Sequence, residues 1–97
     1  MLYSSGSVQK TADASIGPAG KPVRLFAVNM LSGGTAGILV LRNGTSADNA
    51  VWVQETGVIN TGKTVEYGPH GILFPNGCWY DDDSNFTSVT FEFSAEH

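Results

Sequence analysis

The stretch Phe86–Ser94 reads FTSVTFEFS and gives the clearest indication of the fold. Val89, Phe91 and Phe93 alternate with polar residues, so in an extended chain these three side chains share one face. A period of two residues is typical of a strand with one buried face. We therefore predict that Val89, Phe91 and Phe93 lie in the core of a β domain.

The rest of the chain consists of similar short segments, separated by glycine, proline and asparagine. Each segment is rich in β-branched or aromatic residues, at a spacing typical of a sandwich or barrel. The predicted strands are Ser7–Ala12, Pro22–Leu31, Gly37–Arg42, Ala50–Glu55, Lys63–Tyr67, Ile72–Phe74 with a continuation through Cys78–Tyr80, and Phe86–Ser94. The predicted fold is an all-β, small antiparallel β-sandwich or jelly-roll-like barrel of about seven strands.

Turn-forming residues lie between these segments. Asn43-Gly44 and Asn76-Gly77 can supply the positive φ angles of tight turns. Ser32-Gly33-Gly34-Thr35 is long enough to join the strands on either side of it as a hairpin, and Asn60-Thr61-Gly62 can turn the chain into the next strand.

Residues 1–97 are expected to form a single β domain, with residues 1–21 as an extended N-terminal arm or loop. Residues 13–22 read DASIGPAGKP, with two glycines, two prolines and one large apolar side chain, Ile16. One interpretation is a surface connection, since loops of this composition are common. The other is an arm that lies across a neighbouring subunit.

The segment Pro22–Leu31 is apolar at both alternating sets of positions. Val23 and Leu25 belong to one set, and the other set is equally apolar. A strand that is apolar on both faces must be covered on both faces. The residues predicted to form a subunit interface are Phe26, Val28 and Met30.

Composition favours an assembling protein and argues against several partners. Only 14% of residues are charged, against roughly 25% in ordinary soluble domains. With a net charge of −4 and five Lys and Arg residues, no basic stripe for nucleic acid can form. The apolar run Ile38–Leu41 is far shorter than the roughly 20 residues of a membrane-spanning helix, so no membrane partner is expected.

Features at the N-terminus and the cysteine content indicate where the protein is made. The first residues have neither a basic start nor an apolar core, so no signal peptide is expected. Cys78 is the single cysteine, so no internal disulfide can form. We expect synthesis in a reducing cytoplasm and support from association, because so small a domain has marginal stability alone.

The strongest candidate for a metal site is the acidic segment after Tyr80. Asp81, Asp83 and Asn85 match the first three ligand positions of a calcium loop. Phe86 stands where such a loop needs glycine, and the chain continues as a strand. We therefore predict a solvated turn without a required metal or cofactor, and keep Asp81, Asp83 and Asn85 as a weak candidate site.

Catalysis is not expected. Nucleophilic catalysis needs a base within hydrogen-bond reach of the nucleophile. His70 and Cys78 could form such a pair, but nothing near Cys78 in the sequence would lower its pKa, and a buried, inert cysteine is expected instead. We predict no catalytic residues and no enzyme.

Aromatic residues offer an alternative function. A platform of Trp52, Tyr67, Trp79 and Tyr80 could stack against sugars, but aromatic side chains on strands usually fill the core. Buried rings would favour assembly, whereas coplanar rings facing solvent would favour sugar binding.

The segments RLFAVNMLSGGTAGILVLRNGTSADNAVWV, starting at Arg24, and GPHGILFPNGCWYDDDSNFTSVTF, starting at Gly68, carry a resemblance. A strand ending before a Ser-Gly-Gly turn, an apolar strand, a polar RNGTS loop and a late GILFPNGCW segment resemble small virion proteins of tailed bacteriophages. The resemblance spans Arg24 to Val89, about two-thirds of the chain. Its motifs are turns rather than chemical groups, so it assigns no residue a role.

The resemblance implies a short β-sandwich or jelly-roll module that assembles on a capsid, neck or tail. We predict a capsid decoration (cement) protein of the virion, made in the host cytoplasm. Its expected partners are copies of itself, with a trimer favoured, and the major capsid protein or another virion protein. The alternatives are a neck, tail or fibre component and, in another class, a carbohydrate-binding module that uses Trp79 and Tyr80.

Overall fold

The computed structural model describes the backbone of residues 3–96 and the side chains of residues 6–95. Within this part of the chain there are nine strands and no helix, which confirms the all-β prediction. The expected number of about seven strands is too low, because Ala14–Ile16 was not predicted and the continuation of Ile72–Phe74 through Cys78–Tyr80 is a separate strand in the other sheet. The strands are β1 (Tyr3–Lys10), β2 (Ala14–Ile16), β3 (Val23–Ser32), β4 (Ile38–Asn43), β5 (Val51–Thr56), β6 (Gly62–Glu66), β7 (Ile72–Phe74), β8 (Cys78–Asp81) and β9 (Phe86–Glu96).

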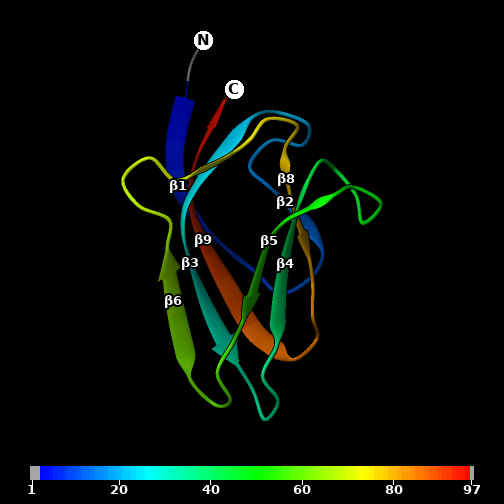
Figure 1. Cartoon of the computed structure of the whole chain (residues 1–97), viewed down its shortest axis with the longest axis vertical. Coiled ribbons are helices and arrows are strands. Elements are labelled where there is room, and N and C mark those ends of the chain that lie inside the picture. Colours follow the sequence, from blue (N-terminus) through cyan, green and yellow to red (C-terminus); the bar gives the residue numbers. More distant parts are fainter. Residues whose placement is uncertain (1–2, 97) are drawn as a thin grey trace.

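The strands form two antiparallel sheets that face each other (Figure 1). The five-stranded sheet has the order β1-β9-β3-β6, and β7 pairs with β3 beyond the end of β6. The four-stranded sheet has the order β2-β8-β4-β5. The chain crosses repeatedly from one sheet to the other, so strands distant in sequence become neighbours. This strand order is that of a jelly roll, with the short β7 as an addition.

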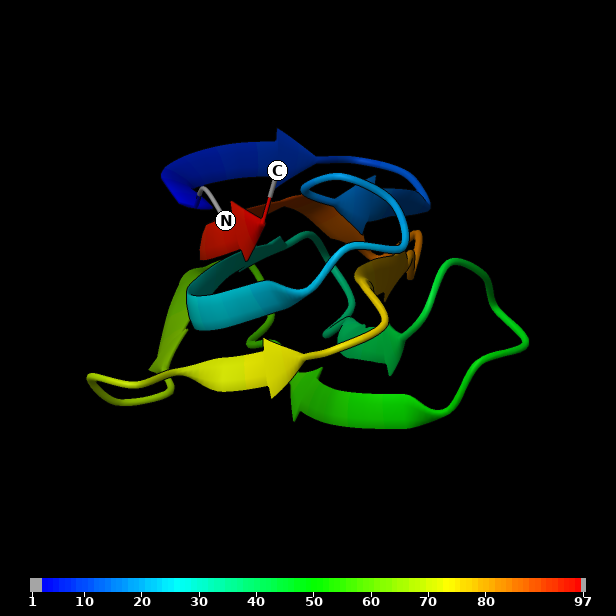
Figure 2. The ribbon, with the colours of Figure 1, turned by 90° about the horizontal axis from the view of Figure 1, so that it is seen from above.

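The core lies between the two sheets and draws on both. Its fully buried side chains include Leu25 and Phe91 from the five-stranded sheet and Leu39, Leu41 and Tyr80 from the four-stranded sheet. The rings of Tyr80 and Phe91 meet across the core with their centroids 5.3 Å apart. β5 and β7 belong to different sheets and come close along one side of the sandwich (Figure 2), where the rings of Trp52 and Phe74 lie with their centroids 5.8 Å apart.

The predicted face of β9 is largely confirmed. Val89 and Phe91 are fully buried, and they pair with Met30 and Val28 of β3. Phe93 faces the same side but is only partly buried, packed against the edge of the core.

The predicted interface on β3 is wrong for two of its three residues. Val28 is 1% exposed and Met30 is 0% exposed, because both lie inside the sandwich of a single chain. The pairing of β3 with β9 shifts register between Leu25 and Ala27, a β-bulge that contains Phe26. A bulge adds one residue to a strand and so reverses the alternation after it. Val23 and Leu25 before the bulge and Val28 and Met30 after it therefore point to the same side and form one buried face. Phe26, within the bulge, is half-buried.

The prediction of an extended arm or loop over residues 1–21 is wrong for the two strands that this segment contains, and residues 1 and 2 lie outside the described part of the chain. β1 pairs with β9 over eight consecutive positions, and β2 pairs with β8. Ile16 is fully buried and anchors β2 in the core. Residues 17–22 form the connection to β3, with Gly17 and Gly20 at positive φ.

The turn predictions have mixed outcomes. Gly44 (φ 155°) and Gly77 (φ 104°) have the positive φ angles predicted for the two Asn-Gly turns, and Asn60 (φ 56°) also has a positive φ where the chain turns into β6. The segment Ser32-Gly33-Gly34-Thr35 does not form a hairpin, because β3 and β4 belong to different sheets. Its backbone instead bonds to other loops, with the Gly33 amide donating to the Asn85 carbonyl at 3.1 Å.

Candidate functional site

The acidic turn between β8 and β9 uses its carboxylates to hold the fold. Asp81 forms an ion pair with Arg42 of β4 at 3.0 Å. Asp82 accepts a hydrogen bond from the Tyr80 hydroxyl at 2.7 Å. Burial of that ring, and then this bond, raise the pKa of Tyr80.

Asp83 ties the same turn to the start of β4. It accepts hydrogen bonds from the Asn85 amide at 3.0 Å and the Ile38 amide at 2.8 Å. These two bonds lower the pKa of the Asp83 carboxyl. The carboxylates thus point to separate partners, and no group of three or more metal-binding side chains of the His, Cys, Asp or Glu type occurs within the described part of the chain.

The proposed pair of His70 and Cys78 is split between surface and core. Cys78 is buried in β8, and this burial raises the pKa of its thiol to about 12. His70 is exposed on the connection between β6 and β7, where its carbonyl accepts a hydrogen bond from Arg24 at 2.8 Å. A thiol with so high a pKa carries almost no thiolate at neutral pH and is a poor nucleophile.

The four aromatic residues do not share a surface. Tyr80 is fully buried, and Trp79 is half-buried on the opposite face of β8. Burial raises the pKa of Tyr67 to about 12, with a smaller contribution from Glu55. Trp52 is 47% exposed and leans on Phe74, with ring centroids 5.8 Å apart. The predicted stacking face of Trp79 and Tyr80 is therefore wrong.

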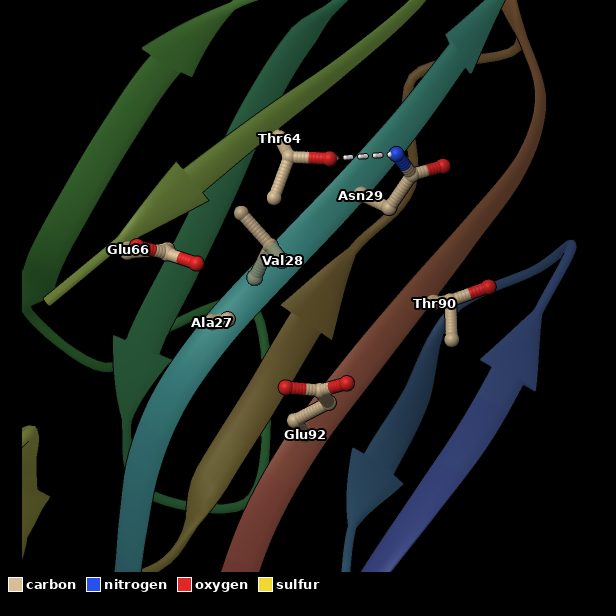
Figure 3. A pocket seen from close by; sticks show the side chains of 7 residues that line it. All are labelled: Ala27, Val28, Asn29, Thr64, Glu66, Thr90 and Glu92. Carbon is tan, nitrogen blue, oxygen red and sulfur yellow. Dashed lines mark hydrogen bonds between the residues drawn. The ribbon is translucent and has the colours of Figure 1, made fainter.

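The outer face of the five-stranded sheet has a shallow groove that the sequence did not reveal. Ala27 of β3 lies between Glu66 of β6 and Glu92 of β9 (Figure 3), and both glutamates are its direct cross-strand partners. The small Ala27 side chain leaves space between the two carboxylates, in a hollow of about 160 Å³.

Uncharged polar groups continue the groove along the strands. Asn29 lies between Thr64 and Thr90, and its amide donates to the Thr64 hydroxyl at 2.7 Å (Figure 3). At the other end a neighbouring hollow of about 360 Å³ adds Phe26 and Pro69 to the lining. The groove thus offers carboxylate, amide and hydroxyl groups beside one half-buried ring, a lining that suits a ligand rich in hydroxyl groups.

A second surface feature is the end of the sandwich where β3 meets β4 and β5 meets β6. Four large apolar side chains near this end are exposed. Leu31 lies on the outer face of the five-stranded sheet and Ile38 on the outer face of the four-stranded sheet, whereas Val58 and Ile59 are consecutive on the connection between β5 and β6. Ile59 is the most exposed of them, at 53%. The two connections are joined by backbone hydrogen bonds, from Gly57 to Gly37 at 2.8 Å and from Asn60 to Gly33 at 2.9 Å. We call this surface the apolar end; it lies at the bottom of Figure 1.

Comparisons with protein families, with curated proteins and with solved structures found no match for this chain. The search for membrane-spanning segments found no sufficiently long and apolar helix in the described residues.

Proposed function

We propose that this chain is a non-enzymatic structural protein of a virus particle, of the capsid decoration type. It binds copies of itself and the major capsid protein or another virion protein. The observation that carries the proposal of a binding role is the apolar end. The choice of a virus particle as the site of binding rests on the resemblance to small phage virion proteins.

The apolar end has the properties of a contact surface. Contiguous exposed apolar patches mark sites of protein association. At this end Val58 and Ile59 follow each other in the chain and are 48% and 53% exposed. Hydrogen bonds between the two connections hold their backbones in place before any partner arrives. Binding by a preformed surface loses less conformational entropy than binding by a loose loop, so more of the contact energy appears as affinity.

Low charge supports the same function. Charged residues are depleted at the centres of protein interfaces, and this chain has 14% charged residues overall. Several of its ionisable groups interact within the chain. Asp81 forms an ion pair with Arg42, and Asp83 accepts a hydrogen bond from the Ile38 amide.

Mass spectrometry of purified particles tests the proposal. We expect the chain in the particles at a copy number comparable with the capsid protein. A few copies per particle would contradict the decoration role and favour a neck, tail or fibre component. Absence from the particles would overturn the proposal altogether.

Two charge variants connect the test to the apolar end. Ile59→Asp should leave the fold intact, because the side chain is largely exposed, and should reduce incorporation into particles. Ala47→Asp adds the same charge to the exposed β4–β5 connection at the opposite end of the sandwich and should incorporate normally. Equal incorporation of both variants would contradict a role for the apolar end.

A carbohydrate-binding module is the second candidate, because the groove around Ala27 presents hydroxyl, amide and carboxylate groups. Titration with oligosaccharides, followed by amide chemical shifts, would test it. Shifts confined to Asn29, Thr64 and Thr90 would support sugar binding at the groove, and no shift at millimolar sugar would exclude that use.

A further inference from the structure

The two sheets have free edges of very different character. β2 and β7 have three residues each. β6 carries Lys63 and Glu66, and the pairing of β5 with β4 has a register shift beside Trp52. Short length, charged residues and irregular pairing are the means by which natural proteins keep edge strands from joining other chains.

β1 lacks these protections. It is eight residues long and lies at the outside of the five-stranded sheet, as the dark blue strand in Figure 2 shows. Its pairing with β9 is regular at all eight positions, and its sequence YSSGSVQK contains no proline. Lys10, its one charged residue, stands at the last position. In an edge strand, about half of the residues direct their N–H and C=O groups away from the sheet, ready to pair.

We propose that β1 pairs antiparallel with β1 of a second copy of this chain, across a two-fold axis. This inference names one surface for the self-association in the proposed function and rests on it to that extent. The two five-stranded sheets then continue into one antiparallel sheet, in the order β9-β1 of one chain followed by β1-β9 of its partner.

A second copy suits this edge better than a strand of different sequence. Antiparallel pairing about a two-fold axis uses the same residues on both chains and closes after two subunits. It places the Lys10 side chains at opposite ends of the contact, so the like charges stay apart. Ser7 and Gln9, which lie exposed along the strand, are uncharged and leave the approach open. The contact predicts a dimer rather than the trimer expected from the resemblance.

The test is the mass of the purified chain by sedimentation equilibrium at micromolar concentrations. We expect twice the chain mass of 10.2 kDa. The double variant Ser7→Lys with Gln9→Lys brings positive charges together at the contact and should sediment as a monomer. Because both side chains are exposed, the thermal midpoint of this variant should be close to that of the parent measured at a concentration low enough for the parent to be monomeric.

A charge-matched control is Ala47→Lys with Gln54→Lys, at two exposed positions on and beside β5, which should remain dimeric. A monomeric or trimeric parent would overturn the proposal, and so would an edge variant that still dimerises. These results are distinguishable from failure of the virion function, which depends on whether the chain is found in particles. An oligomer that ignores the edge variant overturns the β1 contact and leaves the virion function standing.

Discussion

β3 and β9 lie side by side in the five-stranded sheet, yet their sequences relate to the core in different ways. β9 alternates regularly, and Val89 and Phe91 face the core as their spacing predicts. β3 is apolar at both sets of positions because the bulge at Phe26 reverses its faces midway. Apolar periodicity therefore reports a buried face only between irregularities, and two apolar sets in one strand do not require two covered faces.

The largest expected effect is on the regular strand. Phe91→Ala removes a fully buried ring that packs on Tyr80, and such truncations cost about 3–5 kcal/mol through lost transfer energy and the cavity left behind. Thr90→Ala, on the outer face, should cost well under 1 kcal/mol. Urea melts of both variants beside the parent measure the difference. Equal and small losses would show that the faces of β9 are assigned wrongly.

A smaller effect is expected where the two strands meet at the apolar end. A methyl group added at Gly57 would collide with the Ser32 hydroxyl of β3 and approach the Phe86 ring of β9 within 2.9 Å. Overpacking of this kind costs about 1–3 kcal/mol. Gly34→Ala, where the added methyl group meets no atom within 4 Å, is the matched control and should change stability little. A Gly57→Ala variant as stable as the control would mean that the strand ends are loosely packed.

The smallest expected effect is a loss of folding stability at alkaline pH. It arises from Cys78, which lies in the core that β3 and β9 cover. The folded chain raises the pKa of Cys78 from about 9 to about 12. Above pH 9 the unfolded chain therefore loses the thiol proton before the folded chain does, and stability falls as pH rises towards 12. Cys78→Ala should lose less stability than the parent between pH 9 and 10, as followed by thermal midpoints.

Alkylation of the native chain provides a control for the same residue. Cys78 should react at the rate of global or local unfolding, and much more slowly than in urea. Fast alkylation of the folded chain would contradict the burial of the Cys78 thiol and would favour a catalytic role for it.

Much of the fold could be predicted from local patterns, since strands such as β4, β5 and β9 have strong β-formers between turn residues. β2 was missed because its three residues ASI are too few to show a period, and only pairing with β8 makes them a strand. The bulge at Phe26 has no local signature either. It follows from the register that β9 imposes on β3.

Among the features of the candidate sites, some could be predicted from local sequence and others could not. The burial of Cys78 was predicted correctly, because nothing near it in the sequence would lower its pKa and a cysteine of that kind is usually buried. The groove around Ala27 was not predicted. Glu66 and Glu92 are separated by 26 positions in the sequence and come close only because both pair with Ala27 of β3. The free edge of β1 was hidden for a similar reason, since an edge is defined by the strand order of the whole sheet.

The most direct test of the account is the unfolding of Met30→Ala at two protein concentrations. If Met30 belongs to the core of each chain, the variant should lose about 2–5 kcal/mol. The difference from the parent should then be the same at low and high concentration, because the lost contacts lie within one chain. If Met30 instead lay at a subunit contact, the difference would grow with concentration, since association stabilises only the parent. A concentration-dependent difference would contradict the bulge and restore the interface predicted from the sequence of β3.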